Sequence, residues 1–305
     1  MFVHSDYKRM IKLSILVTNY NYGHYLEETL SSLFQNKRMD EVEVLFVDDA
    51  STDNSREVVE KLNLPLRTFC HEKNLGQEEA LNTLYPHIRG LYVHPFAADD
   101  IMLPGALDTM LSYFDRFPHI AAFCSDVALF EEGQKMRVQP LFETKEFHYF
   151  SPKAVCHLFA HTDFWIPGPT IFAKKEIFLQ YGPFDKKLYS INDWWVNHRI
   201  AFFEGVGYIP CAISKQRQHA HSFGRRISKE KVIASWLHLF ELLNNDPKLK
   251  PLYRTGVFRM FGLRIIYKHL LFRPRYWKYL LPMMRKMVEE RLFKNRNQAW
   301  LRRVS

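Results

Sequence analysis

The sequence predicts an α/β protein with a mostly parallel central sheet flanked by helices and a basic helical appendage at its C-terminal end. From Leu13 onward, short apolar or β-branched runs alternate with segments of helical periodicity. Clusters of polar residues follow directly after three of the runs. Because parallel sheets bind ligands at the carboxyl ends of their strands, these clusters predict a ligand site at that edge.

The expected elements follow the apolar runs in order. Strands are expected at residues 13–18, 42–47, 66–70, 91–94, 120–124 and 206–209, helices at 26–34, 77–85, 103–117 and 193–204, and a basic loop at 215–226. Asn54 with Glu57 three residues later is typical of a further helix start, and Pro104 is typical of a first helical turn. We expect residues 1–226 to form the sheet domain and residues 227–305 to form a basic, aromatic-rich helical region.

The composition is that of a globular protein. Of the 305 residues, 47% are hydrophobic and 25% are charged, which excludes disordered, collagen-like and disulfide-rich classes. The four cysteines lie far apart without a CxxC pair, so we expect buried thiols in a reducing compartment and no zinc site. No apolar run is long enough to span a membrane, and the first residues do not resemble a cleavable signal, so we expect a cytoplasmic protein.

The positive charge is concentrated in one segment. The whole chain has a net charge of +9, but residues 251–305 alone hold fourteen Lys and Arg against two acids. Large apolar and aromatic side chains alternate with these cations, which predicts basic amphipathic helices lying on an anionic membrane surface. Alternatively, the helices pack their apolar face on the sheet domain. Since no RNA- or DNA-binding pattern accompanies the cations, we expect no nucleic-acid partner.

Carboxylates occupy the turns where a dinucleotide-binding protein would have glycines. The chain contains no GxGxxG and no GxxxxGK[ST], which disfavours NAD enzymes and P-loop NTPases. Asp48, Asp49 and Asp53 follow the second strand, and Asp99 and Asp100 follow the fourth. Such carboxylates either bind a nucleotide and a divalent cation or cap helices and loops, and the capping alternative is strongest for Asp53.

Five motifs in order resemble the inverting family 2 glycosyltransferases, which have the GT-A fold. The motifs are VTNYNYGHYLEETLSSL, EVLFVDDASTDNSREVV, NLGQEEALN, AADDIMLPGALD and INDWW, and the resemblance covers residues 13–223. It implies transfer of a sugar from a nucleotide diphosphate sugar to an acceptor hydroxyl, with Mg²⁺ or Mn²⁺ as cofactor.

The resemblance also implies donor-binding residues. Thr18 and Tyr20 would flank the nucleotide, Asp48 or Asp49 would contact the base, and Asn74 of the NLG motif would bind the donor.

Asp99 would ligate the metal as the last residue of the family's DxD motif. Two departures accompany it, because Ala97 stands where the family often has Asp and Leu81 stands where it often has Arg.

The segment KQRQHAH resembles the family's Arg-x-His element. The resemblance implies that Arg217 pairs with the diphosphate and that His219 is a second metal ligand, although His221 competes for that role. A solvated basic loop is the alternative.

Asp193 of NDWW matches the family's catalytic Asp, with Asn192 in place of the preceding Glu. Inversion needs a base that removes the proton from the attacking hydroxyl, and an N-cap role for Asp193 is compatible with that chemistry. Trp194 and Trp195 would stack on the acceptor sugar or, equally well, belong to the core.

We therefore expect a glycosyltransferase that adds one sugar at a time in the synthesis of a cell-surface or lipopolysaccharide-type glycan, because the QxxRW element of processive synthases is missing. Its partners would be a nucleotide diphosphate sugar, a glycan or lipid-linked acceptor and the inner face of a membrane. The alternatives are an inactive nucleotide-sugar-binding or membrane-docking protein, and a nucleotidyltransferase. The nucleotidyltransferase is disfavoured because NYNYGHY contains no cation for a triphosphate.

Overall fold

The protein is described here from a computed structural model, which covers residues 10–161, 166–182, 184–219, 227–245 and 247–249, together with Leu271, Phe272, Pro274 and Trp277. Most of the predicted basic region at 251–305 therefore lies outside the described residues. Among the helices that are described, none is both long enough and apolar enough to cross a membrane.

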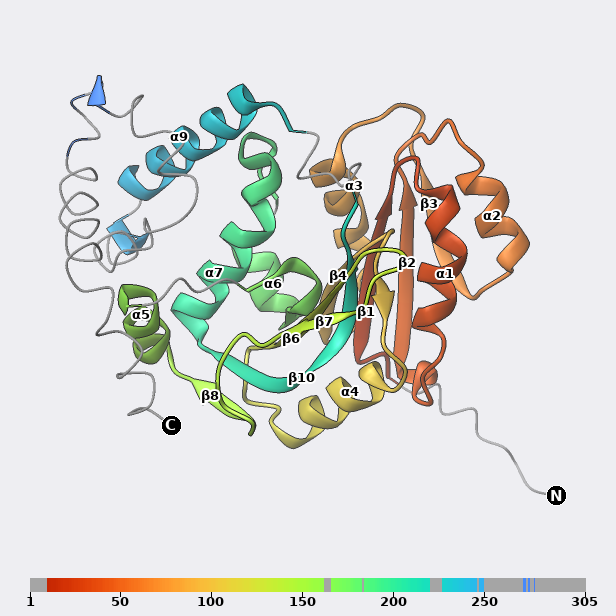
Figure 1. Ribbon diagram of the computed structural model, residues 1–305, viewed down its shortest axis with the longest axis horizontal. Coiled ribbons are helices and arrows are strands. Elements are labelled where there is room, and N and C mark those ends of the chain that lie inside the picture. The colour runs from red at the N-terminus through yellow and green to blue at the C-terminus, as the bar shows by residue number, and fades with distance from the viewer. Residues whose placement is uncertain are drawn as a thin grey trace.

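One sheet runs through the molecule in the order β3-β2-β1-β4-β9-β6-β10-β5 (Figure 1). Its long strands are β1 (Leu13–Asn19), β2 (Val42–Asp48), β3 (Leu66–Cys70), β4 (Tyr92–Ala97), β6 (Ala122–Phe130) and β10 (Val206–Arg217). β1 pairs in parallel with β2 and β4, β2 with β3, and β6 with β10. The mostly parallel sheet flanked by helices confirms the predicted fold class.

The antiparallel strands are short and were not expected from the sequence. They are β5 (Ile101–Met102), β7 (Arg137–Gln139), β8 (His148–Phe150) and β9 (Phe172–Lys174). β9 lies between β4 and β6 and joins the two parallel groups of strands. Runs of two or three residues are too short to show an alternating pattern, so the sequence gives no signal for them.

Helices cover both faces of the sheet. They are α1 (Gly23–Leu33), α2 (Ser55–Leu62), α3 (Gln77–Leu84), α4 (Ala106–Arg116), α5 (Pro152–His161), α6 (Lys175–Tyr181), α7 (Asn192–Glu204) and α9 (Lys229–Asn245), with short 3-10 turns η1 (Met39–Glu41), η2 (Tyr85–His87), η3 (Gly168–Thr170), η4 (Lys186–Ile191) and η5 (Pro247–Leu249). Apolar side chains of α1 and α4 form one hydrophobic core with the sheet, and those of α3, α6, α7 and α9 form a second core on the other face.

Several predicted bounds differ from the observed ones. β10 is eight residues longer at its C-terminal end than the expected strand at 206–209, so the expected basic loop at 215–226 begins inside a strand. A shift in register near Ala212 allows β10 to bend and continue its pairing with β6. α4 begins at Ala106, so Pro104 lies in the turn before the helix.

α9 follows the predicted domain boundary at residue 226, yet it packs into the core of the sheet domain. Trp236 is 4% exposed, and its ring centroid lies 6.2 Å from that of Trp194 in α7. His238 Nε2 lies 2.6 Å from Asp185 Oδ2, just before η4. Figure 1 shows α9 beside α7, so a boundary at residue 226 would separate helices that share a core.

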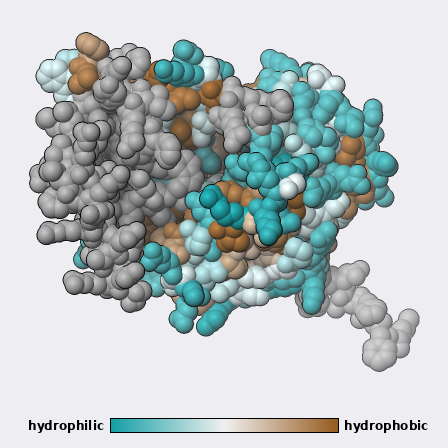
Figure 2. Space-filling view, viewed as in Figure 1, coloured by the Kyte–Doolittle hydropathy of each residue, from teal (hydrophilic) through white to brown (hydrophobic). Residues whose placement is uncertain are grey.

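The surface is mostly hydrophilic over the side built from α1, α2 and α3 (Figures 1 and 2). Figure 2 also shows a hydrophobic patch near the middle of this face, where Figure 1 places β6 and β7. Met136 and Val138, at and beside β7, are each 46% exposed. This short hairpin is therefore a peripheral addition to the sheet.

Candidate active site

Two adjoining cavities open at the carboxyl ends of the parallel strands. The first, called cavity A, has a volume of about 440 Å³ and is lined by the ends of β1 and β4, the start of α3 and the start of α9. The second, called cavity B, has a volume of about 400 Å³ and extends from β4 toward η3 and α7. Both are lined by Thr18, Gln77, Ala97, Asp99 and Tyr189. Cavities are therefore present at the edge of the sheet where the sequence predicts a ligand site.

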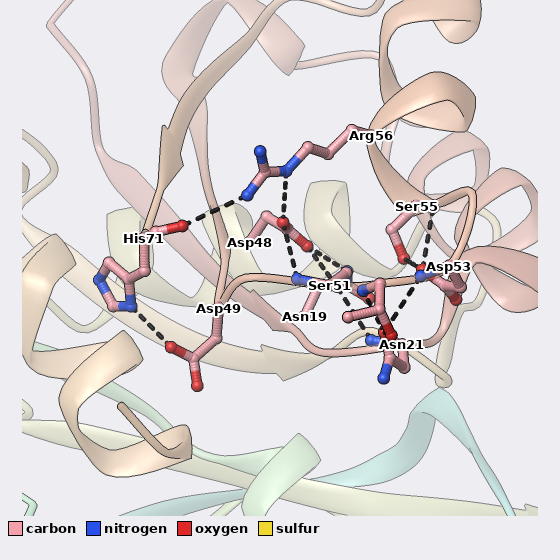
Figure 3. Close-up of polar contacts among 10 residues, drawn as sticks. Asn19, Asn21, Asp48, Asp49, Ser51, Asp53, Ser55, Arg56 and His71 are labelled. Carbon is pink, nitrogen blue, oxygen red and sulfur yellow. Dashed lines mark hydrogen bonds and ion pairs between the residues drawn. The ribbon is translucent and has the colours of Figure 1, made fainter. Parts of the chain in front are cut away.

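The side chains of Asp48 and Asp49 point in opposite directions from the end of β2 (Figure 3). Asp48 is only 1% exposed, and its carboxylate accepts hydrogen bonds from Asn19 Nδ2 at 2.9 Å, Ser51 Oγ at 2.5 Å and Arg56 Nε at 2.8 Å. Burial raises the pKa of this carboxyl group, but the hydrogen bonds outweigh burial, so its pKa lies below the usual value. Asp48 therefore stabilises the turn after β2 and does not line either cavity.

Asp49 lines cavity A. Its carboxylate accepts hydrogen bonds from the backbone N–H groups of Leu75 and Gly76, each at 2.9 Å, and lies 2.7 Å from His71 Nδ1. His71 Nε2 lies 3.0 Å from Thr83 Oγ1 in α3. These contacts fix Asp49, which is 2% exposed, at the wall of the cavity, and of the two carboxylates expected to contact a base only Asp49 lines a cavity.

Three further predicted donor-binding residues also line cavity A: Thr18, Tyr20 and Asn74. Tyr20 is 39% exposed, so its ring is open to a ligand. Sequence-distant residues from β1 and the loop before α3 therefore meet in one cavity, as the resemblance implies.

Asp53 serves the structure of the turn, as the capping alternative supposes. Its carboxylate accepts a hydrogen bond from the backbone N–H of Ser55 at 3.0 Å (Figure 3). It also accepts one from the backbone N–H of Gly23 at 2.9 Å. Asn54, the expected helix start, occupies the N-cap position of α2 but makes no capping hydrogen bond with its side chain. Asp53 satisfies the first helical N–H group instead.

Asp99 lies between the two cavities and contacts the predicted second metal ligand. Asp99 Oδ2 lies 2.9 Å from His219 Nε2, and the imidazole packs against the rings of Tyr22 and Tyr25. The two groups form a hydrogen-bonded pair, and a carboxylate and an imidazole are both side chains that can hold a divalent cation. Within the described residues, no third His, Cys, Asp or Glu joins them. The remaining ligands would then come from substrate and water.

Asp100 is a buried neighbour of Asp99. Burial, together with the nearby charge of Asp99, raises the pKa of Asp100 well above its usual value. Asp100 Oδ1 accepts a hydrogen bond from the backbone N–H of Arg217 at 3.0 Å, which ties the end of β10 to the turn after β4.

Arg217 has partners other than a diphosphate. Its side chain is 2% exposed and donates to Asp99 O at 3.0 Å, and it forms ion pairs with Glu28 and Glu132, each at 2.5 Å. Its guanidinium also lies 4.4 Å from the ring centroid of Tyr25. Arg217 lines cavity B, but its Nε and both terminal nitrogens already donate within the protein, so its pairing with a diphosphate stays a prediction that would require it to leave these partners.

Asp193 is the second residue of α7 and lines cavity B. Its carboxylate is half-buried and accepts a hydrogen bond from the N–H of Trp194 at 2.7 Å. A Cβ at Gly168 would lie 2.9 Å from Asp193 Oδ2, so any larger residue at position 168 would displace the Asp193 carboxylate from its present position. Burial raises the pKa of Asp193 to about 6, although the N–H groups of Trp194 and Gly168 partly oppose the shift.

The two tryptophans that follow Asp193 belong to the core. Trp194 is 2% exposed and Trp195 is 6% exposed, and both pack in the hydrophobic core that contains α7 and α9. Neither lines cavity A or cavity B. The prediction that they stack on an acceptor sugar is corrected, since no ring face is open to a ligand.

Sequence reasoning missed several cavity residues, among them Glu78, Tyr189 and Lys231. Glu78 is 7% exposed, its pKa is raised by burial, and Asn192 Nδ2 donates to it at 3.4 Å. Tyr189 has φ 43° and ψ −126°, a conformation that favours glycine. Lys231 comes from α9, in a segment assigned to the C-terminal appendage. Only Glu78 lies in a quoted motif, NLGQEEALN, so only Glu78 had a sequence signal.

The two departures from the family pattern also lie at the cavities. Ala97 lines both cavities, and Leu81 lines cavity B while packing in the core at 5% exposure. The short side chain at position 97 leaves space beside Asp99, and the apolar side chain at position 81 removes a cation from the wall of cavity B.

A sheet of this topology with acidic residues around two cavities at its carboxyl edge is the architecture of a GT-A glycosyltransferase. The family model described as "Glycosyl transferase family 2" matches residues 14–172 of this chain. The chain belongs to this family.

Curated relatives are similar over part of the chain. An uncharacterized glycosyltransferase of Nostoc sp. is 33% identical over 107 residues, which cover 34% of this chain and 33% of that protein. The chondroitin synthase of Escherichia coli is 31% identical over 111 residues, which cover 36% of this chain and 16% of that protein. The chain thus spans about a third of the length of the Nostoc relative.

Solved structures share the fold over most of the chain. S. aureus TarS residues 1–349 in complex with UDP-GlcNAc match with a TM-score of 0.61 and 19% identity, over 86% of this chain and 73% of that one. The mannosyltransferase PcManGT from Pyrobaculum calidifontis in complex with GDP-Man and Mn²⁺ matches with a TM-score of 0.57 and 15% identity, over 95% of this chain and 83% of that one.

Proposed function

We propose that the protein is a metal-dependent inverting glycosyltransferase that moves one sugar at a time from a nucleotide diphosphate sugar to an acceptor hydroxyl. The proposal rests on the observation that Asp99 and Asp193 both line cavity B. In that cavity, a side chain suited to the metal and diphosphate and a side chain suited to proton removal can act on one sugar.

Cavity A has the size and composition expected for the nucleotide. Its volume lies within the range of about 300 to 1,000 Å³ that is usual for small-molecule sites. Asp49 would accept hydrogen bonds from the base, with Tyr20 and Asn74 beside it. The two similar solved structures are complexes with UDP-GlcNAc and with GDP-Man, which supports a nucleotide sugar as the class of donor.

Asp99 and His219 are the residues that would hold Mg²⁺ or Mn²⁺, which would stabilise the negative charge that develops on the departing diphosphate. The Mn²⁺ named with the mannosyltransferase supports a divalent ion in this place.

Asp193 would act as the general base. The acceptor oxygen bonds to the anomeric carbon while the bond between that carbon and the diphosphate oxygen breaks, and Asp193 takes the acceptor proton. With a pKa of about 6, the group is ionised at neutral pH and is a stronger base than an ordinary aspartate. The N–H of Trp194 orients the carboxylate toward the cavity.

The acceptor in this proposal is a glycan or a lipid-linked sugar. The similarity to a chondroitin synthase supports polysaccharide synthesis. The fourteen Lys and Arg of residues 251–305 would attract an anionic membrane surface, which would place the enzyme at the cytoplasmic face of a membrane.

The experiment is a donor-hydrolysis and transfer assay. The full chain is incubated with UDP-, GDP- and dTDP-sugars and Mn²⁺, and release of the nucleoside diphosphate is measured with and without EDTA. Transfer products are examined by NMR for the configuration of the new bond. Release that depends on the metal, with inversion, is the expected result. Retention of configuration, or release that EDTA does not change, would contradict the proposed mechanism.

A further inference from the structure

Charge at cavity A is not balanced by the residues that line it. Asp49 and Asp99 are both in its wall, and a nucleoside diphosphate would add further negative charge. Arg217, the cation at the neighbouring cavity B, is already neutralised by Glu28 and Glu132. A divalent ion offsets part of this charge, so a further protein cation would favour diphosphate binding.

Lys231 is the one cation among the described residues that line cavity A. It is exposed and forms no ion pair with a carboxylate in the described part of the chain. Its ammonium group instead lies 5.2 Å from the ring centroid of Tyr189, which lines both cavities. A cation–π contact at a solvent-exposed site is weak, about 0.5 to 1 kcal/mol, so a phosphate oxygen would compete for this ammonium group.

The position of Lys231 is fixed by the packing of α9. Trp236 and Phe240, farther along the helix, are buried in the core. His238 contacts Asp185, just before the turn that carries Tyr189. Anchored in this way, α9 holds its first turn against cavity A, and only the flexible lysine side chain has to move to reach a ligand.

We propose that Lys231 binds the diphosphate of the donor nucleotide, while Arg217 keeps its ion pairs with Glu28 and Glu132. The ammonium group exchanges the face of Tyr189 for the phosphate oxygens and neutralises charge on the diphosphate as it departs. This inference rests on the proposed function, because it concerns the donor of the same reaction.

The test compares Lys231→Gln with Lys229→Gln in the full chain. Lys229 is exposed and lies in the same first turn of α9, but it does not line cavity A, so it controls for general charge. Affinities for UDP, GDP and dTDP, and for the matching monophosphates, are measured by calorimetry with Mn²⁺. The thermal midpoint without ligand is measured as the control for folding.

Lys231→Gln is expected to lower the affinity for the diphosphate that the wild type binds by about 10- to 100-fold, the loss expected when a charge-assisted hydrogen bond is removed. Monophosphate affinity should change less, and Lys229→Gln should change neither affinity by more than about twofold. Lys231→Arg should retain most of the diphosphate affinity.

The outcomes separate the two proposals. A wild type that binds none of the three diphosphates overturns the proposed function and this inference with it. A wild type that binds, with Lys231→Gln binding equally well, overturns the role of Lys231 alone. Equal losses in Lys231→Gln and Lys229→Gln also overturn it, because the effect would then be one of general electrostatics.

Discussion

Asp99 and Asp193 line one cavity, although the first follows β4 and the second begins α7. The antiparallel pairing of β9 with β4 brings this about, because it carries the turn at Gly168 to the carboxyl edge of the sheet. Gly168 then allows Asp193 to approach closely. The carboxylate proposed as the base and the carboxylate proposed to bind the metal thereby line one cavity, as the proposed displacement requires.

Asp193→Asn is expected to lower kcat by about 10²- to 10⁴-fold, because the amide cannot remove a proton. Nucleoside diphosphate affinity should stay within about twofold of wild type, since cavity A is not lined by Asp193. The measurements are steady-state transfer rates and calorimetry with the preferred nucleotide. A variant that loses nucleotide affinity to the same extent would assign Asp193 to structure.

The pH dependence of transfer follows from the raised pKa of Asp193. Its ionised form is the base, so kcat/KM should fall about tenfold per unit as the pH drops below about 6 and should level off above it. The folded state favours the protonated form of Asp193. As the pH rises from the pKa of the unfolded state to about 6, the free energy of unfolding therefore decreases. Asp193→Asn should therefore be more stable than wild type at pH 7, by about 1 to 2 kcal/mol after allowance for its partial exposure. Chemical denaturation at pH 7 checks the sign.

Much of the fold follows from local sequence. β1, β2 and β3 begin where the sequence predicts and end within one residue of the predicted ends. For β1 and β2 the reason is that continuous apolar runs are typical of buried parallel strands. The edge at which the acidic clusters meet follows from strand direction alone.

The contacts of particular side chains did not follow from the sequence. The Arg-x-His resemblance predicts a diphosphate partner for Arg217, but no local pattern reveals Glu28 and Glu132, which lie far from it in the sequence. The sequence of α7 does not show which residues are buried, because this helix is buried on nearly all sides and lacks the polar face of an amphipathic surface helix. Burial of Trp194 and Trp195 could therefore not be distinguished from exposure at a site.

The metal site is tested by Asp99→Asn and His219→Gln. Each should weaken Mn²⁺-dependent nucleotide binding by about 10-fold or more, because each removes one of the two proposed protein ligands. His24→Gln is the matched control, since His24 is an exposed histidine that packs on Tyr25 without contacting Asp99. Nucleotide affinity is measured in Mn²⁺ and in EDTA. Wild-type affinity that is the same in both solutions would remove the metal from the proposal.

Asp48→Asn is expected to separate structure from binding at the end of β2. Its lowered pKa stabilises the folded state above the unfolded pKa, and this contribution is lost as the pH falls through the folded value. The variant should therefore be less stable than wild type at pH 7, by about 1 to 2 kcal/mol, and the difference should shrink toward pH 3. Asp49→Asn should instead weaken nucleotide binding. Thermal scans across pH and calorimetry measure the two effects, and the reverse assignment would contradict the geometry of Figure 3.

Arg217 and its two glutamates provide the last prediction. Arg217→Met removes the hydrogen bond to Asp99 O and the contact with Tyr25, while Glu28 and Glu132 stay solvated because their side chains are 59% and 75% exposed. We expect a loss of about 1 to 3 kcal/mol of stability, measured by chemical denaturation, because a charge-assisted hydrogen bond and a ring contact are lost but no buried charge is left unpaired.

The double variant Glu28→Gln/Glu132→Gln tests the same assignment from the other side. If Arg217 serves the structure, releasing it from both carboxylates lowers the thermal midpoint and leaves diphosphate affinity within about twofold of wild type. If Arg217 instead binds the donor, the freed guanidinium binds diphosphate more tightly. Calorimetry with and without Mn²⁺ distinguishes the two results, and a gain in affinity would return Arg217 to the donor site and remove the need for Lys231.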